Sequence, residues 1–258
     1  MNANAVIEHI TSWLLEYNQN AGTKGFVVGV SGGIDSPVTS TLAARTGLPV
    51  LCLEMPIHQS SEQVTRAMEH IEWLKLHYPN VRMESVELTQ VFDGFIKSMP
   101  PSDESSRDMA LVNSRARIRM TTLYYFAALE SKLVAGTGNK VEDFGIGFFT
   151  KYGDGGVDLS PIADITKSEV YALGMELGII ESIMSAPPTD GLWGDNRTDE
   201  DQIGASYAEL EWAMEFDGEE KGLEKRQTEV LAIYRKLNRV NRHKMEAIPV
   251  CRLPDSLR

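Results

Sequence analysis

Short apolar runs alternate along this chain with longer segments in which apolar residues recur every three or four positions. The apolar runs indicate buried strands, and the longer segments indicate amphipathic helices. The predicted strands are 26–30, 48–53, 82–88 and 132–136. The predicted helices include 6–17, 37–45, 60–77, 108–131 and a last one that ends near 241. This alternation predicts an α/β fold: a doubly wound parallel sheet of about five strands with helices on both faces.

Two capping boxes and two irregular segments divide the chain further. The capping boxes are Ser60 with Gln63 and Thr166 with Glu169, and each opens a predicted helix. Segments 138–160 and 186–200 lack a clear period, and the second is rich in Pro, Gly and Asp. Long irregular connections are often functional. We therefore expect two mobile, lid-like loops within one domain that spans 1–258.

The long predicted helix has an unusual surface. Its residues 123–128 read Leu-Tyr-Tyr-Phe-Ala-Ala and are apolar on nearly every side. A helix that is apolar on every side is expected to be buried on every side. The chain's own sheet can cover only one of its faces, so another surface must cover the rest. The pattern predicts a homodimer with this helix at the seam.

Composition limits the class of protein. The chain has 258 residues, of which 42% are hydrophobic, and a formal net charge of −12. The acidic balance argues against nonspecific binding of nucleic acid. No apolar run approaches the length of a membrane span, and the first residues lack a signal pattern, so we expect a cytoplasmic protein with no membrane partner. Cys52 and Cys251 lie too far apart for a redox pair or a cysteine metal cluster.

The segment 26–37 carries the most specific chemical signal. An apolar run ends in Ser-Gly-Gly-Ile-Asp-Ser at 31–36, and Pro37 follows. Glycines let main-chain N–H groups approach a ligand, and Ser36 with Pro37 is predicted to cap a helix whose N-terminus favours anions. We interpret the segment as a phosphate-binding nest with Asp35 beside a metal ion. The alternative is an ordinary strand-to-helix turn.

A second signal follows the fourth predicted strand. Ligands bind beyond the carboxyl ends of parallel strands, so segments 31–35, 54–56 and 136–139 are expected to share one crevice. Asp35 and Glu142 come from two of these ends, and both are suitable oxygen ligands for Mg²⁺. The alternative is that Glu142 is a solvated acid of the loop.

Several motifs in order resemble one family. The 31–36 loop is similar to the pyrophosphate loop of the ATP pyrophosphatases, which cleave ATP between its α- and β-phosphates. Together with the loop, further segments resemble the ammonia-dependent NAD synthetases, whose fold is that of the adenine nucleotide alpha-hydrolases. These segments are Asn-Ser-Arg-Ala-Arg-Ile-Arg at 113–119, Gly-Thr-Gly-Asn-Lys-Val-Glu at 136–142 and Phe-Phe-Thr-Lys-Tyr-Gly-Asp-Gly-Gly-Val-Asp at 148–158. Shorter matches at 166–167, 188–190 and 243–244 extend the resemblance to about residue 244.

The resemblance implies a ligase. Such an enzyme uses ATP and Mg²⁺ to amidate deamido-NAD to NAD with ammonia, through an adenylated intermediate, and releases AMP and pyrophosphate. Nothing in the chain resembles a glutaminase, so free ammonia is the expected nitrogen donor. The family is homodimeric, with a substrate site that spans the interface.

The resemblance also assigns residues. It implies ATP contacts at Ser31, Gly32, Gly33, Asp35, Ser36, Arg119, Thr137, Lys167 and Thr189. It implies deamido-NAD contacts at Asn113, Arg117, Lys151, Asp158, His243 and Lys244. Asp154 and Lys151 are the expected catalytic residues, and Asp35 and Glu142 the expected magnesium ligands.

Two of these residues also have a chemical reading of their own. An anionic Asp154 can bind ammonium and accept the proton that leaves before nitrogen attacks, although Asp154-Gly155-Gly156 also has the composition of a tight turn. Lys167 opens a predicted helix, where a cation opposes the helix dipole. A nearby anion explains that position, and a surface lysine is the alternative.

Two rival functions stay open at this point. One is the same ATP chemistry with another acceptor, as in GMP synthetase-like or tRNA-modifying enzymes, which need a basic face, catalytic cysteines or a different second motif. The other is a nucleotide-binding regulator without catalysis, which has no need for Asp35, Glu142 and Asp154 together.

Overall fold

The computed structural model describes residues 1–102, 104–189 and 198–258. One parallel sheet lies at the centre of these residues, with strand order β3-β2-β1-β4. Its strands are β1 (Phe26–Gly29), β2 (Val50–Glu54), β3 (Val81–Ser85) and β4 (Leu133–Val134), close to the predicted ranges. Phe26 pairs with both Val50 and Leu133, so β1 lies inside the sheet.

The described residues form four strands where the sequence predicts about five. Beyond β4, Ala135 makes an isolated parallel bridge with Leu159, which extends the pairing by one position without forming a fifth strand. The α/β class and the parallel sheet flanked by helices are confirmed.

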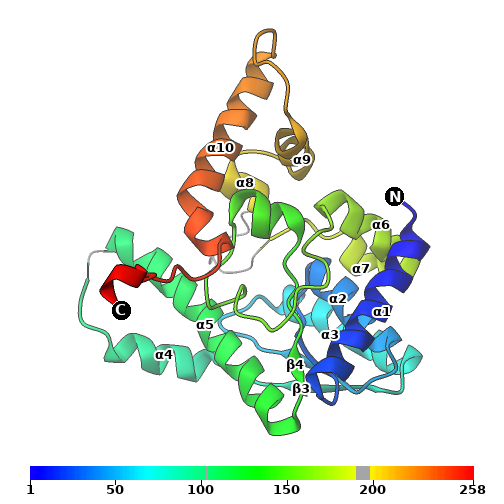
Figure 1. The fold of residues 1–258 in the computed structure, drawn as a ribbon. Helices are drawn as coiled ribbons and strands as arrows, with labels where there is room; N and C mark the ends of the chain where they lie inside the picture. Colours follow the sequence, from blue (N-terminus) through cyan, green and yellow to red (C-terminus); the bar gives the residue numbers. More distant parts are fainter. Residues whose placement is uncertain (103, 190–197) are drawn as a thin grey trace.

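Helices cover both faces of the sheet (Figure 1). Side chains alternate along β1: Phe26 and Val28 pack into one apolar cluster, and Val27 packs into another. The first cluster includes side chains of α1 (Ala3–Ala21), α2 (Asp35–Arg45), α3 (Ser61–His77) and α6 (Lys167–Leu177). The second includes side chains of α4 (Thr89–Ser98) and α5 (Glu104–Glu130).

A third apolar cluster stands beyond the carboxyl ends of the strands, at the top of Figure 1. It combines the π-helix η1 (Val141–Ile146) with α8 (Asp199–Ile203), α9 (Tyr207–Glu215) and α10 (Lys225–Met245). The remaining described elements are α7 (Glu181–Met184) and the 3₁₀ turn η2 (Asp255–Leu257). None of the helices in the described ranges combines the length and the apolar character that a bilayer crossing requires.

The predicted cap of α2 is wrong. The helix begins at Asp35, and the residue before it, Ile34, makes no side-chain cap. The Ser36 hydroxyl instead accepts the N–H of Ser31 at 2.8 Å, so it closes the loop after β1 and cannot cap the helix. The predicted capping box of α6 is confirmed in full. That of α3 is confirmed in half, because Ser60 accepts from the N–H of Gln63, whereas Gln63 Oε1 accepts from Gln59 Nε2.

Two other boundaries differ from the predictions. The last long helix continues to Met245, so His243 and Lys244 lie in its final turn. The segment 138–160 contains η1, so it is not an irregular loop throughout. Of the predicted lid at 186–200, residues 190–197 lie outside the described residues.

A buried histidine on α3 makes stability depend on pH. His70 is fully buried, and its Nε2 lies 3.0 Å from Ser40 Oγ. Burial lowers the pKa of His70 from 6.5 to about 3, so between these values only the unfolded chain takes up the proton. The free energy of unfolding therefore falls as the pH falls, by roughly 1.4 kcal/mol per unit.

We expect the substitution His70→Gln to remove this slope. When the pH is lowered from 6.5 to 5, the free energy of unfolding measured in urea should fall by about 2 kcal/mol more in wild type than in the variant. His77→Gln, at the exposed end of the same helix, is the matched control and should keep the wild-type slope. Equal losses in wild type and His70→Gln would contradict the assignment.

Candidate functional site

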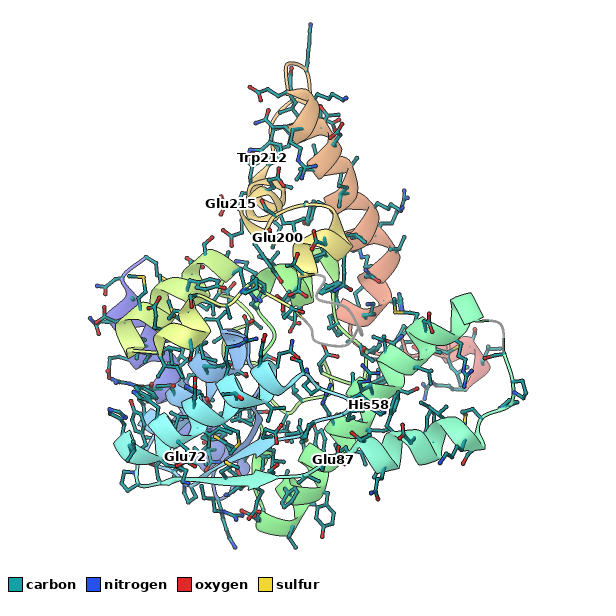
Figure 2. All side chains as sticks on the ribbon, turned by 180° about the vertical axis from the view of Figure 1, so that it is seen from behind. His58, Glu72, Glu87, Glu200, Trp212 and Glu215 are labelled. Carbon is teal, nitrogen blue, oxygen red and sulfur yellow. The ribbon has the colours of Figure 1, made fainter. Side chains whose placement is uncertain are left out.

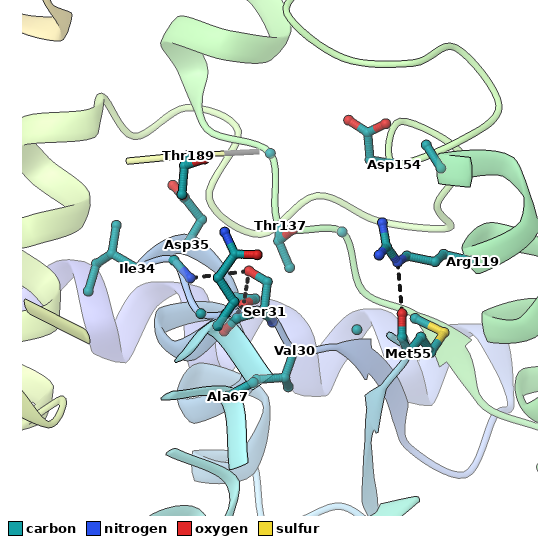
Figure 3. Close-up of a pocket in the computed structure, with 18 of the residues that line it drawn as sticks. Val30, Ser31, Ile34, Asp35, Met55, Ala67, Arg119, Thr137, Asp154 and Thr189 are labelled. Carbon is teal, nitrogen blue, oxygen red and sulfur yellow. Dashed lines mark hydrogen bonds between the residues drawn. The ribbon is translucent and has the colours of Figure 1, made fainter. Parts of the chain in front are cut away.

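A cavity of about 290 Å³ opens at the carboxyl ends of the strands. Its walls come from the ends of β1, β2 and β4, which confirms the shared crevice predicted from topology. Figure 3 shows Ser31 and Asp35 on one side of it and Arg119 and Asp154 on the other. All nine residues assigned to ATP line this cavity: Ser31, Gly32, Gly33, Asp35, Ser36, Arg119, Thr137, Lys167 and Thr189.

Contacts within the loop after β1 and with α3 fix its path. The hydroxyls of Ser31 and Ser36 lie 3.1 Å apart, and the N–H of Gly33 donates to Ser31 Oγ at 3.4 Å. A Cβ at Gly32 would come within 3.0 Å of the carbonyl oxygen of Gln63 on α3, and Arg66 Nε donates to the Gly32 carbonyl at 3.2 Å. A larger residue at position 32 would therefore force α3 or the loop to shift.

Three charged side chains meet at the cavity wall. Lys167 Nζ lies 2.6 Å from Asp35 Oδ2 and 3.0 Å from Glu142 Oε1. Asn139 Nδ2 donates to Asp35 Oδ1 at 3.0 Å. Lys167 is the first residue of α6, and only 5% of its side chain is exposed. The two carboxylates share one site, as the sequence predicts, and they are the anions that explain a lysine at the start of a helix.

Burial and charge set the protonation of this group. Burial by itself would raise the pKa of Glu142, but Lys167 and the hydroxyl of Tyr207 outweigh it and lower that pKa. Burial raises the pKa of Asp35, and the Lys167 ammonium opposes this rise. Burial alone would favour a neutral amine at Lys167, yet the two carboxylates raise its pKa above the usual value. At neutral pH the wall therefore holds a fixed cation next to ionised carboxylate.

Arg119 of α5 supplies positive charge on the other side of the cavity. Its Nε donates to the carbonyl oxygen of Met55 at 2.9 Å, and its Nη2 donates to Gln59 Oε1 at 2.7 Å. Burial, followed by repulsion from Arg115, lowers the pKa of Arg119 to about 10, so the side chain remains charged at neutral pH. The cavity is thus flanked by two cations, the buried Lys167 and the partly buried Arg119.

Asp154 lies where this cavity meets a smaller one of about 150 Å³. Its Oδ1 accepts the N–H of Thr150 at 3.0 Å, and burial nevertheless raises its pKa to about 6. The tight turn predicted here exists as well, because the N–H groups of Gly153 and Gly156 donate to the carbonyls of Thr150 and Gly153. A turn and a carboxyl group that lines the cavity are therefore compatible at this position.

Asp143 is a cavity residue that the sequence prediction missed. It lines both cavities, and burial together with repulsion from Glu142 and Asp154 raises its pKa to about 8. Its carboxyl group occupies the space where a Cβ of Gly138 would stand, so a larger residue at 138 would displace the Asp143 side chain. The adjacent acids at 142 and 143 were a signal, but their spacing alone does not tell which of them faces the crevice.

The residues assigned to deamido-NAD form a separate group. None of the six lines the larger cavity, and Lys244 lines the smaller one. Arg117 Nε donates to the carbonyl of Lys151 at 3.3 Å, and Lys151 Nζ donates to the carbonyl of His243 at the end of α10. Asn113 accepts from the hydroxyl of Thr150 at 2.7 Å. These contacts bring α5, the 148–158 segment and α10 together.

Two of these six residues, Lys244 and Asp158, form hydrogen bonds with main-chain groups. Lys244 Nζ donates to the carbonyls of Gly147 and Phe149 at 2.6 and 2.8 Å. Asp158 accepts the N–H of Val134 at 2.8 Å and the hydroxyl of Tyr124 at 3.0 Å, so it ties β4 to α5. In this structure both side chains brace the 147–158 segment.

Comparisons with known proteins identify relatives of this chain. The family model described as NAD synthase matches residues 6–248. NH(3)-dependent NAD(+) synthetases from Carboxydothermus hydrogenoformans and Methanosarcina mazei are 40% and 35% identical, over 79% and 93% of this chain and 82% and 95% of theirs.

Solved structures agree with the sequence comparisons. The NMN synthetase of Francisella tularensis has a TM-score of 0.85 at 29% identity, covering 98% of this chain and 100% of that one. The NH3-dependent NAD synthetase of Campylobacter jejuni has a TM-score of 0.78 at 28% identity, with the same coverage of both chains. The loop after β1, the paired acids at the strand ends and these likenesses lead to one conclusion: this chain belongs to the NAD synthase family.

Proposed function

We propose that this chain amidates deamido-NAD to NAD with ammonia and ATP. The observation that carries the proposal is the convergence of Asp35 and Glu142 on the Lys167 ammonium, beside the 31–36 loop, in a cavity that all nine expected ATP residues line. Membership in the NAD synthase family supplies the reaction class, a ligase. A nucleotide-binding regulator without catalysis would not need these three charged side chains together.

The residues of the cavity fit a magnesium ion. Asp35 and Glu142 are hard oxygen donors, and they already hold one cation, the ammonium of Lys167, at 2.6 and 3.0 Å. Bound Mg²⁺ neutralises charge on the polyphosphate of ATP and polarises it towards cleavage. Asp35 and Glu142 are the residues that would hold the ion.

The cavity residues divide the work on ATP. The 31–36 loop binds the phosphates through its N–H and hydroxyl groups, and Lys167 supplies a buried positive charge next to them. Arg119, anchored to Met55 and Gln59, supplies positive charge on the opposite wall. A nicotinate carboxylate oxygen then forms a bond to the α-phosphorus, and the bond from that phosphorus to pyrophosphate breaks.

Asp154 serves the second half of the reaction. With its pKa raised to about 6 by burial, it is mostly ionised at neutral pH and close to the value that suits a general base. It binds the incoming ammonium and takes up its proton. The ammonia nitrogen bonds to the activated carbonyl carbon and loses a second proton to solvent. The bond from that carbon to the AMP oxygen breaks, and NAD and AMP are the products.

The dinucleotide is proposed to bind beside Arg117, Lys151 and Lys244, next to the smaller cavity. Lys151 is proposed to hold the nicotinate half near Asp154. A second copy of the chain is proposed to complete this region, because α5 exposes the apolar side chains of Tyr125 and Leu129 by 63% and 66%.

A single assay tests the proposed reaction. Purified protein is given Mg·ATP, deamido-NAD and either ammonium or glutamine, and the nucleotides are separated after incubation. We expect NAD and AMP in equal amounts with ammonium, and much less with glutamine. Nicotinic acid mononucleotide is offered in parallel, because one similar structure is that of an NMN synthetase. ADP as the product, or AMP without NAD, would contradict the proposal.

The substitution Asp154→Asn should separate the two half-reactions. We expect ammonia-dependent NAD formation to fall by about 100-fold or more, since a positioned general base is typically worth that much. Exchange of pyrophosphate into ATP, measured with deamido-NAD and no ammonia, should change only a few-fold. The ratio of the wild-type rate of NAD formation to that of Asp154→Asn should fall below pH 6, where Asp154 is protonated.

The matched control is Asp164→Asn, an exposed carboxylate that pairs with Lys140 on the surface. It should leave both half-reactions as in wild type. If Asp154→Asn amidates at the wild-type rate, the assignment of Asp154 to the ammonia site is wrong.

The substitution Lys167→Met should destabilise the protein and make it responsive to metal. Removing the ammonium leaves two buried carboxylates without their partner, which costs about 3 kcal/mol. Added Mg²⁺ should then raise the melting temperature of the variant, measured without nucleotide, more than that of wild type. Lys140→Met on the surface is the control. Equal shifts in wild type and Lys167→Met would show that Asp35 and Glu142 do not bind the ion.

A further inference from the structure

Tyr207 is a buried residue of the site that no part of the proposed chemistry uses. It is the first residue of α9, placed there by a capping box between Ser206 and Glu209, and only 5% of it is exposed. Its N–H donates to Glu200 Oε1 at 3.0 Å. The backbone at this position is therefore fixed from both sides, which leaves the side chain little freedom.

The side chain of Tyr207 touches both charged partners on the cavity wall. Its hydroxyl lies 2.6 Å from Glu142 Oε1, the same oxygen that accepts from Lys167. The Lys167 ammonium stands 4.8 Å from the centre of the Tyr207 ring. One residue thus contacts the carboxylate through a hydrogen bond and the ammonium through its aromatic face.

The hydroxyl also reaches a third group. Asp199 Oδ2 lies 3.1 Å from it, and Asp199 is itself buried. Burial and the two carboxylates raise the pKa of Tyr207, so the hydroxyl keeps its hydrogen. A hydroxyl has one hydrogen to donate, and the shorter contact, to Glu142, is the stronger one.

Asp199 connects this hydroxyl to the rim of the cavity. Its N–H donates to the carbonyl of Pro188 at 3.1 Å, and both Pro188 and Asp199 line the cavity. Tyr207 therefore connects Asp199, at the rim of the cavity, to the Glu142 carboxylate on its wall.

We propose that Tyr207 is a positioning residue that holds the carboxylate of Glu142 in the orientation required to bind the metal ion of Mg·ATP. The inference rests on the proposed function for its metal and nucleotide. Partners that orient a metal ligand from behind commonly change metal affinity by 10- to 100-fold when they are removed. Tyr207 acts through Glu142 and does not itself touch the substrate.

A purely structural role makes a different prediction. If Tyr207 only fills space among the apolar side chains of α9 and α10, then phenylalanine retains the ring, its packing and its contact with Lys167. Removing the hydroxyl would in that case leave metal binding unchanged. The hydroxyl alone therefore distinguishes the two roles, and Tyr207→Phe is the informative substitution.

The test measures binding of Mn²⁺ by electron paramagnetic resonance, with α,β-methylene-ATP present and no turnover. We expect Tyr207→Phe to weaken Mn²⁺ binding about tenfold and to raise the KM for Mg²⁺ by a similar factor, with the KM for deamido-NAD within twofold of wild type. Tyr234→Phe is the matched control, because Tyr234 packs in the same apolar cluster and likewise loses only its hydroxyl. Mn²⁺ affinity within twofold of wild type in Tyr207→Phe would overturn the proposal.

A double-mutant cycle decides the same question by a second route. If Tyr207 acts through Glu142, Tyr207→Phe should change Mn²⁺ affinity less than twofold in a Glu142→Gln background. A full tenfold effect in that background would show that Tyr207 acts elsewhere. Since binding is measured without turnover, a wild type that makes no NAD would refute the proposed function while leaving this result interpretable.

Discussion

The ammonium of Lys167, held between Asp35 and Glu142, is the interaction on which the rest of the site depends. The lysine is 132 residues from Asp35 and 25 from Glu142 along the chain, so the pair of contacts joins the starts of α2 and α6 to η1. Buried charges without partners are costly, so each of these elements needs the others in place. Figure 2 shows Glu200 of α8 and Trp212 and Glu215 of α9 in the part of the molecule that rises above the sheet, where the third apolar cluster lies.

The same arrangement explains why the site belongs to a ligase that brings anions together. A cavity meant for a triphosphate must present positive charge, and here two cations, the buried Lys167 and the partly buried Arg119, stand on opposite walls. We propose other purposes for the acids beside them: Asp35 and Glu142 would hold a divalent cation, and Asp154 would bind ammonium. The overall charge of −12 says nothing about this local balance, because the fold selects which side chains face the cavity.

The meeting of the strand ends at the site could be predicted from the order of strands and helices. The residues around it could not, because tertiary contacts determine them. The strand ends meet because alternating strands and helices give a parallel sheet, and this order is visible in the sequence. The cap of α2 was mispredicted because Ser36 bonds to Ser31 within the loop, which competes with capping. Tyr207 carries no local signal: its role comes from Glu142, 65 residues earlier, and no pattern of spacing encodes such a contact.

The separation between the ATP residues and the dinucleotide residues has a physical meaning. The first group lines one cavity within a single chain, whereas Arg117, Lys151 and His243 lie outside that cavity, linked to one another through backbone carbonyls. Exposed charges bind a dinucleotide weakly in water, so a tight site needs a further surface to exclude solvent. α5 carries both Arg117 and the exposed apolar side chains of Tyr125 and Leu129. A second copy packed on this helix would cover the charges and the apolar patch together, which is why we connect dimer formation to substrate binding.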